Sequence, residues 1–399
     1  EQWWGGFHAE VKIDEDSKDW YLKFEYPCEI YKIWDATVFS RNGNKYLIKG
    51  PGEPKSGFGF LAKGCMGWEK PAGIRFFPPD QAGDGNLPIF NNAPSGSVVA
   101  LNGWLKIVNN RLSNQRGEPI QLRGVSTHGL QWWQGRFANH EVVKWVKNDW
   151  NVKVFRAAMY TREGGYIDDR GVKYKVEEVI KAAIAEGVYV IVDWHILSDY
   201  NPLWHVGEAK EFFRDISSRY GKNPNIIYEI CNEPNKDAGW NNAIRPYAEQ
   251  VIPVIRQNDP NNIIVVGTPN WSSNLYEPAD NPLKGPGFHN IMYSFHLYAG
   301  SHDTANLDWI QNVIDRGIPV FVTEWGVSKA DGSNGIYLES SKRFLDFLDG
   351  KKISWVSWSL SDSDESSALL NPGAHTYGWW RGYNLTEAGH FIKSRLWKK

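Results

Sequence analysis

The sequence predicts an α/β protein whose main part is a (β/α)8 TIM barrel, preceded by a small all-β sandwich domain. From about residue 101 onward, short apolar segments alternate with amphipathic helical segments, as in a parallel sheet covered by helices. Before residue 65, apolar and polar residues instead alternate with a period of two. We therefore expect a sandwich over 1–64, a partly packed linker over 65–100 and a barrel over 101–399.

The sandwich is predicted from alternating stretches at 7–13, 20–26 and 46–48, separated by turns such as the Gly- and Pro-rich run at 50–54. No long helical period interrupts them. The next stretch, 65–100, lacks periodicity and is rich in Gly, Pro, Asn and Ser, which is typical of a linker. Its aromatic residues indicate that parts of it pack.

The barrel is predicted from eight candidate strands with helices between them. The helical pattern is clearest at 172–186, 208–220 and 336–348. Eight βα units over roughly 300 residues match the size of such a barrel. The candidate strands are 121–125, 152–157, 188–194, 226–231, 263–267, 291–295, 318–323 and 353–358.

Composition narrows the class of ligand. Lys+Arg 44 and Asp+Glu 46 leave a net charge of −2, which does not favour binding to nucleic acid or to an anionic membrane. The sequence contains no run of ~20 apolar residues, so it predicts no membrane span. Trp 21, Tyr 18 and Phe 18 are an aromatic excess. Most aromatic residues fill cores, but a flat Trp face also stacks on sugar rings, so the composition favours a carbohydrate ligand.

Cysteine usage and the start of the chain bear on the compartment. Three cysteines form neither a metal-binding pattern nor a dense disulfide framework. Cys231 is expected to be buried, whereas Cys28 and Cys65 could pair in a secreted protein, a point that the sequence leaves open. The chain begins without a signal-like leader, as a mature form would. We expect a secreted, extracellular monomer without a cofactor or metal.

Two glutamates each follow a short apolar strand. Glu233 comes after the predicted strand 226–231, and Glu324 comes after 318–323. The carboxyl ends of barrel strands form one face, so both carboxylates would point into one cleft. A pair of carboxylates in one cleft is how glycoside-cleaving enzymes place their acid and their nucleophile.

Other polar and aromatic residues also follow the strands rather than precede them. Taken singly, an Arg in a barrel usually pairs with a carboxylate, and a His is usually a core or rim residue. Several at the same end of successive strands indicate one site. The residues concerned are His128, Trp132, Arg156, Tyr160, His195, Asn232, Trp271, His296, Tyr298 and Trp358.

Five motifs carry a resemblance to a known family: VFRAAMYT at 154–161, VDWH at 192–195, YEICNEPN at 228–235, SFHLYA at 294–299 and VTEWG at 322–326. They resemble glycoside hydrolase family five, and within it the bacterial-type endo-β-1,4-glucanases (cellulases). The resemblance implies a retaining hydrolase acting on β-1,4-glucan polysaccharides and oligosaccharides. It further implies that Glu233 is the acid/base and Glu324 the nucleophile.

The resemblance also implies roles for the surrounding residues. Arg156 and Tyr298 would donate to Glu324, His296 would lie against Glu233, and Asn232 would bind a sugar 2-hydroxyl. Contacts with hydroxyls or with neighbouring catalytic groups would come from His128, Tyr160 and His195. Stacking platforms would be Trp132, Trp271 and Trp358, although core packing is the alternative for Trp132 and Trp358.

One position departs from the family pattern. Members usually carry a Lys after the eighth strand, two residues before a Glu that binds a distal glucose. Here Ser363 stands at the Lys position, while Glu365 is retained. The distal subsite is therefore expected to be weaker or to favour another glucan. Asp362, Asp364 and Glu365 could also suggest Ca²⁺, but the spacing favours a solvated loop.

The N-terminal region resembles the cellulose-binding modules of family two. Trp3 and Trp34 match two of the tryptophans that form the flat cellulose-binding face of that family, and Trp20 matches a buried one. The third platform and the disulfide that ties the ends of the module have no counterpart. Either the module binds cellulose, weakly or fully, or it is a structural appendage.

Alternatives remain at the level of the sequence. A β-mannanase or a xyloglucanase could use the same barrel, because subsite loops decide the sugar. From another functional class, the chain could be a carbohydrate-binding protein without catalytic activity. Asn270 and Asn384 lie in glycosylation acceptor sequences that only a eukaryotic secretory route would use.

Overall fold

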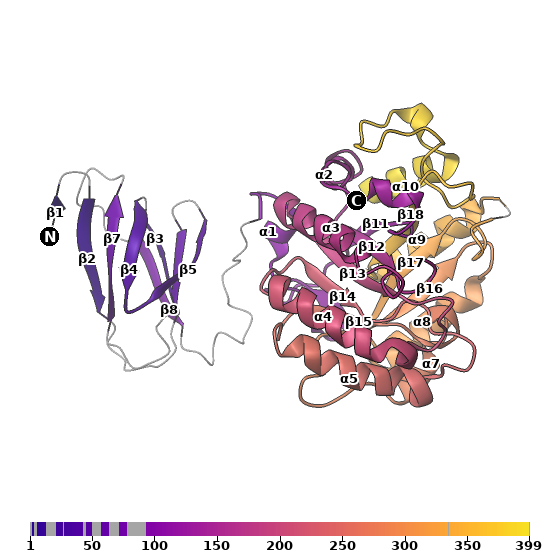
Figure 1. The fold of residues 1–399 in the computed structure, drawn as a ribbon, viewed down its shortest axis with the longest axis horizontal. Helices are drawn as coiled ribbons and strands as arrows, with labels where there is room; N and C mark the ends of the chain where they lie inside the picture. The colour runs from indigo at the N-terminus through magenta and orange to yellow at the C-terminus, as the bar shows by residue number, and fades with distance from the viewer. Residues whose placement is uncertain are drawn as a thin grey trace. The chain divides into compact units, whose positions relative to one another are not determined.

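The computed structural model describes residues 2–3, 6–12, 21–26, 28–42, 45–49, 57–63, 72–77, 93–333 and 335–398. The chain divides into two compact units, Glu1–Asn92 and Ala93–Lys399. Figure 1 shows strands alone in the first unit and strands surrounded by helices in the second. In the described part of the chain, no helix is long and apolar enough to cross a membrane.

The first unit contains two four-stranded antiparallel sheets, with strand orders β1-β2-β7-β4 and β5-β6-β3-β8. Both sheets contribute to one apolar cluster that includes Phe24 and Tyr46 from one sheet and Phe60 from the other. The alternation in the sequence produces this arrangement, because every second side chain of a strand points to the same face. The strands are β1 (Gln2–Trp3), β2 (Gly6–Lys12), β3 (Tyr21–Glu25), β4 (Glu29–Trp34), β5 (Thr37–Asn42), β6 (Lys45–Lys49), β7 (Gly57–Lys63) and β8 (Ala72–Phe77).

Two described parts of the segment expected to be a linker, 72–77 and 93–100, belong to the folded units. β8 (Ala72–Phe77) pairs with β3 and completes a sheet, and residues from Ala93 onward belong to the second unit. Turn-forming residues around β8 hide its short period from a sequence reading. Cys28 is disulfide-bonded and Cys231 is free and buried, while Cys65 and Trp20 lie outside the described residues.

The second unit is a closed barrel of eight parallel strands, as the alternation of apolar and helical segments predicts. The strands are almost entirely buried, since helices cover them outside and side chains fill them inside. Their bounds are β11 (Arg123–Thr127), β12 (Val154–Tyr160), β13 (Tyr189–His195), β14 (Ile226–Glu229), β15 (Ile263–Val266), β16 (Ile291–Tyr298), β17 (Val320–Gly326) and β18 (Trp355–Leu360).

Amphipathic helices surround the barrel (Figure 1). α3 begins and ends where its pattern predicts, because Gly187 follows it in a left-handed conformation that favours Gly. The longer helices are α2 (His140–Asp149), α3 (Val172–Glu186), α4 (Val206–Tyr220), α5 (Arg245–Arg256), α8 (Thr304–Asp315), α9 (Leu338–Lys351) and α10 (Glu387–Trp397). The short ones are α1 (Val98–Asn102), α6 (Pro269–Ser272), α7 (Tyr276–Asp280), η1 (Trp133–Phe137), η2 (Pro202–His205), η3 (Trp240–Ile244) and η4 (Gly382–Asn384).

The amino-terminal end of the barrel is closed by α1 and by a hairpin of β9 (Lys106–Val108) and β10 (Arg111–Ser113). Val99, Leu105 and Leu112 from this segment share an apolar cluster with strand residues such as Ile191 and Phe321. This plug was not predicted, since its elements are too short to show a period. It leaves the carboxyl ends of the strands as the open face of the barrel.

Candidate active site

A cleft of about 610 Å³ lies at the carboxyl ends of the strands. The residues predicted for the site line it, except Arg156 and Asn232, which are fully buried behind its wall. Sequence reasoning missed several further lining residues, because they lie in loops without a chemical motif. These are Leu197, Asn270, Ser273, His302 and the segment 330–332.

Glu324 lies in β17 and is held by two donors. Tyr298 donates its hydroxyl to Glu324 Oε1 at 2.6 Å, and Arg156 Nη1 donates to Oε2 at 2.9 Å. Burial by itself raises the pKa of this carboxyl, but the charges of His296 and Arg156 and the Tyr298 hydroxyl lower its pKa overall. Glu324 is therefore held as a carboxylate.

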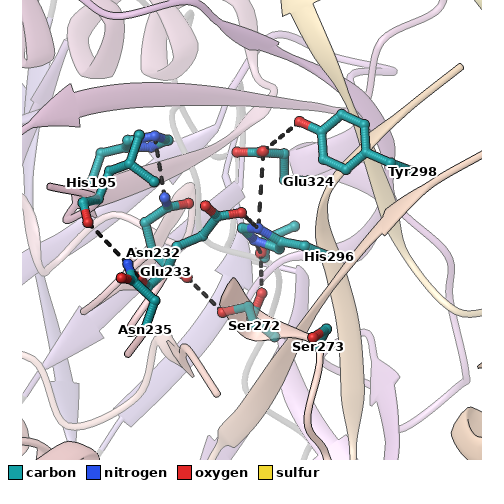
Figure 2. A network of polar contacts seen from close by, with 12 residues as sticks. His195, Asn232, Glu233, Asn235, Ser272, Ser273, His296, Tyr298 and Glu324 are labelled. Carbon is teal, nitrogen blue, oxygen red and sulfur yellow. Dashed lines mark hydrogen bonds and ion pairs between the residues drawn. The ribbon is translucent and has the colours of Figure 1, made fainter. Parts of the chain in front are cut away.

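Glu233 lies four residues beyond the end of β14, in a different environment. His296 Nδ1 is 2.7 Å from Glu233 Oε1 (Figure 2). Burial raises the pKa of Glu233; the His296 hydrogen bond lowers it and the charge of Glu324 raises it again, so the pKa stays above its usual range. Burial disfavours the charge on His296, yet Glu324, Glu229 and Glu233 together raise the pKa of His296 to about 10. Of the two carboxyl groups, Glu233 therefore keeps its proton to the higher pH.

The two carboxyl groups lie close together. His296 of β16 and Glu324 of β17 are partners in the barrel register, and His296 Nδ1 is 3.9 Å from Glu324 Oε1. Ligand atoms of Glu233, His296 and Glu324 all lie within 4.8 Å of one another. An inverting glycosidase needs a wider gap of about 6.5–9.5 Å for a water molecule, whereas a retaining pair is about 5–5.5 Å apart. The spacing therefore matches a retaining pair.

Below the pair, Arg156 connects three acidic side chains. Its guanidinium is 2.7 Å from Glu229 Oε2, 2.9 Å from Glu324 Oε2 and 3.0 Å from Asp193 Oδ2. Burial raises the pKa of Asp193, whereas Arg156 and His296 overcome burial and lower the pKa of Glu229 to about 2. Sequence reasoning did not assign Asp193 or Glu229 to the site. The signal was present, because each is an acidic residue inside an otherwise apolar barrel strand.

His195 and Asn232 form a second buried chain of hydrogen bonds. His195 Nδ1 is 2.6 Å from Asp193 Oδ2, and Asn232 Nδ2 is 3.2 Å from His195 Nε2 and 3.1 Å from Ile196 O. Burial and the charge of Arg156 lower the pKa of His195, so its neutral ring donates from Nδ1 and accepts at Nε2. Both amide hydrogens of Asn232 thus have partners. Its Oδ1 accepts from Arg156 Nη2 at 2.6 Å and has a second lone pair for a further donor, such as a sugar hydroxyl.

The predicted aromatic platforms differ in exposure. Trp271 is 46% exposed and Trp132 is 36% exposed, whereas Trp358 is 6% exposed and contacts the rings of His128 and His195. All three line the cleft. Trp132 and Trp271 therefore offer open faces, and Trp358 forms part of the floor.

Trp271 is presented by an unusual turn. Asn270, Trp271 and Ser272 all have φ near +55° (57°, 55° and 54°), a left-handed conformation that is unfavourable for residues other than Gly. Ser272 Oγ donates to Asn232 O at 2.6 Å (Figure 2). The Trp271 amide donates to Pro234 O at 3.0 Å. These bonds join the Trp271 platform to the backbone that carries Glu233.

The loop after β18 carries Ser363, which stands where family members usually have a Lys. Glu365 lines the cleft and is 3.1 Å from His128 Nε2; burial raises its pKa, but the bond and charge of His128 lower it overall. Asp362 pairs with Arg136, and the Ser363 hydroxyl lies 2.8 Å from that of Ser361. Two of the three acidic groups proposed for Ca²⁺ are thus already paired. Among the described residues, the one cluster with metal-ligand spacing is Glu233, His296 and Glu324.

A (β/α)8 barrel with two close carboxyl groups in opposite protonation environments defines the glycoside hydrolase class. Comparison with known proteins gives the family. The model of the cellulase family (glycosyl hydrolase family 5) matches residues 113–364, and the chain belongs to this family.

Named relatives are endoglucanases. The chain is 50% identical to Endoglucanase A of Evansella cellulosilytica over 306 residues, which cover 76% of this chain but 62% of that relative. It is 34% identical to Endoglucanase E-5 of Thermobifida fusca over 426 aligned residues, covering 99% of this chain and 89% of that one. The solved catalytic domain of Thermobifida fusca endoglucanase Cel5A, in complex with cellotetraose, matches with a TM-score of 0.72 and 37% identity, covering 76% of this chain and 100% of that chain.

Proposed function

We propose that this chain is a retaining endo-β-1,4-glucanase that hydrolyses internal bonds of cellulose or related β-glucans. The observation that carries the proposal is the close pair of Glu233 and Glu324, in which the pKa of Glu233 is raised and the pKa of Glu324 is lowered. Their opposite environments are what a double displacement requires. The endoglucanase relatives and the cellotetraose complex of one of them support a β-glucan substrate.

In the first step, Glu324 attacks the anomeric carbon while Glu233 gives its proton to the leaving glycosidic oxygen. The C1–O bond breaks, the shortened chain leaves as an alcohol, and an α-linked glycosyl ester forms on Glu324. Tyr298 and Arg156 keep the attacking carboxylate ionised and oriented. His296, 2.7 Å from Glu233, balances the charge that remains on Glu233 after the proton leaves.

In the second step, Glu233 acts as a base. It takes a proton from water as the water oxygen attacks the anomeric carbon, and Glu324 leaves as a carboxylate. Each step inverts the configuration at the anomeric carbon, so the two steps together return the β-configuration. Asn232, on the segment that carries Glu233, would accept the 2-hydroxyl at Oδ1, which also accepts from Arg156.

The wider role follows from the same proposal. We infer a secreted, monomeric enzyme whose open cleft accepts the middle of a chain, with Trp132 and Trp271 as stacking platforms and Glu365 with His128 at one end. Ser363 leaves that end without a lysine, so the glucan preference depends on the remaining contacts. Mannan and xyloglucan are the competing substrates.

The test combines substrate and stereochemistry. The chain should release reducing ends from carboxymethylcellulose and not from mannan, and proton NMR of the first products should show the β-anomer before mutarotation. Release of reducing ends from mannan alone would make the chain a mannanase rather than a glucanase. An initial α-anomer would exclude the retaining mechanism.

We further propose that the first unit is a β-sandwich resembling family two cellulose-binding modules, with Trp34 as part of its binding face. Trp34 ends β4 and its indole lies against Gly59 of β7, so close that a Cβ on Gly59 would be 2.1 Å from the ring. An indole lying flat on a strand suits stacking on a flat sugar surface. Trp3 is the second expected contact; it lies in β1, and its side chain is outside the described residues.

Trp34→Ala should lower the fraction of the full chain pulled down by crystalline cellulose several-fold, while hydrolysis of a soluble oligosaccharide stays unchanged. The stacking face is lost but the barrel is untouched. Trp397→Ala, an exposed tryptophan of the barrel unit, is the matched control and should bind cellulose normally. Equal pull-down of both variants and the unmodified chain would make the unit a structural appendage.

A further inference from the structure

The loops that carry Leu197 and Glu233, two residues of the cleft wall, continue into a cluster of two aromatic rings and a cation. Trp204, in η2 (Pro202–His205), is 60% exposed, and its ring meets that of Tyr200 edge-on at 5.9 Å and 73°. Lys236 places its Nζ 3.3 Å from the centroid of the Tyr200 ring. Tyr200, Trp204 and Lys236 are called the rim cluster below. Core packing does not account for it, because the indole of Trp204 faces solvent.

The backbone holds the rim cluster in a defined shape. Tyr200 has a φ of 47° and Lys236 a φ of 53°, and both residues are unfavourable in this left-handed region. Such conformations persist only where surrounding bonds determine them, and they concentrate at functional sites. Here the amide of Asn235 donates to Tyr200 O at 3.1 Å and joins the two loops.

The same loops carry the acid/base. Asn235 Nδ2 donates to Glu233 O at 2.8 Å and to Leu197 O at 2.9 Å, and Leu197 lines the cleft. Trp271 is bonded through its amide to Pro234 O. The rim cluster is therefore continuous with the cleft wall formed by Glu233, Leu197 and Trp271.

The chemistry of the pair shows which half of the substrate this wall faces. An acid must touch the glycosidic oxygen that leaves, so the loops around Glu233 border the leaving-group half. Glu365, His128 and Trp132 come from the loops after β18 and β11 and contact one another. By the family resemblance, Glu365 binds a distal glucose, so these residues would hold the part of the chain that stays attached to Glu324.

We propose that the rim cluster is an additional glucosyl-binding subsite on the leaving-group side of the cleft, a proposal that rests on the proposed function. A β-1,4-linked glucose unit has two apolar C–H faces and an edge of hydroxyl groups. The open indole of Trp204 suits a face, and the Lys236 ammonium offers donors to the edge. Tyr200 orients both, because it contacts each of them.

The experiment compares a long with a short substrate in the full chain. Cellohexaose can reach the rim cluster, whereas p-nitrophenyl cellobioside has no sugar on the leaving-group side. Trp204→Ala should lower the ratio of kcat/KM for cellohexaose to that for the chromogenic substrate about tenfold, as loss of one stacking contact would. Lys236→Met should lower the ratio less. Trp309→Ala, another exposed tryptophan, is the control and should leave the ratio unchanged.

Each outcome decides the proposal. A lower ratio for Trp204→Ala and Lys236→Met, with a normal ratio for Trp309→Ala, supports the subsite. An equal fall for both substrates would make the rim cluster a support for the loop of Glu233, and an unchanged ratio would remove any role in binding. If the unmodified chain hydrolyses neither substrate, the proposed function fails, and the subsite fails with it.

Discussion

Glu324→Gln is expected to lower kcat on cello-oligosaccharides by on the order of 10⁴-fold or more, while cellotetraose still binds. Gln has nearly the same shape as Glu and can still accept the Tyr298 hydroxyl that now reaches Oε1 at 2.6 Å. It cannot form the glycosyl ester, since an amide is a poor nucleophile. Stopped assays would measure turnover, and calorimetric titration with cellotetraose would measure binding.

Glu365→Gln is the matched control, because Glu365 lines the same cleft but bonds to His128 rather than to the carboxyl pair. It should raise KM with a much smaller change in kcat. Near-normal turnover by Glu324→Gln would contradict the nucleophile assignment.

Azide distinguishes the two glutamates. With Glu324→Ala, azide should enter from the vacated side and give an α-glycosyl azide. With Glu233→Ala and an activated substrate, it should replace water in the second step and give the β-product.

Arg156→Met is expected to destabilise the barrel unit by about 3–5 kcal/mol, the usual result of leaving buried charges without their partner. Arg156 is fully buried and lies within 3.0 Å of carboxylate oxygens of Asp193, Glu229 and Glu324. As the pH falls, the variant should also lose activity at a higher pH than the unmodified chain does. Glu324 must be ionised to attack, and loss of the cation raises its pKa, so protonation begins at higher pH.

Thermal unfolding and the pH dependence of kcat/KM on an oligosaccharide would measure the two effects of Arg156→Met. Arg162→Ala is the control, because Arg162 pairs with Asp168 at the surface, where the two side chains are 46% and 38% exposed. Its effect on stability should stay within about 1 kcal/mol. Equal stability of the two variants would show that the buried acids are neutral without Arg156. If the acid limb of the pH profile of Arg156→Met shifted to lower pH, the role of Arg156 at Glu324 would be contradicted.

The predicted strands locate the site well but end differently from the observed ones. Residues 291–295 were expected as a strand, yet β16 continues to Tyr298, so that His296 pairs in register with Glu324. The amphipathic and apolar periods come from local burial and are visible in sequence. The ends of strands are decided by partners in neighbouring strands, which local sequence does not contain.

Some roles also depended on tertiary contacts. Asn232 and Glu233 are adjacent in sequence, but Asn232 faces His195 behind the wall and Glu233 faces the cleft. Asp193 and Glu229 are register partners on neighbouring strands, and only their closure around Arg156 makes them part of the site.

The sequence by itself determined the barrel, its polar end and the identity of the two glutamates, because periodicity and residue chemistry are local properties of the chain. The family resemblance assigned the acid/base role to Glu233, but only the tertiary structure supplies the physical reason for it. Glu233 and Glu324 have the same side chain, but burial keeps the pKa of Glu233 raised, whereas the charges of His296 and Arg156 and the Tyr298 hydroxyl lower the pKa of Glu324. Tyr298 comes from the neighbouring strand β16, but Arg156 lies 168 residues before Glu324, and only closure of the barrel brings it to that carboxylate.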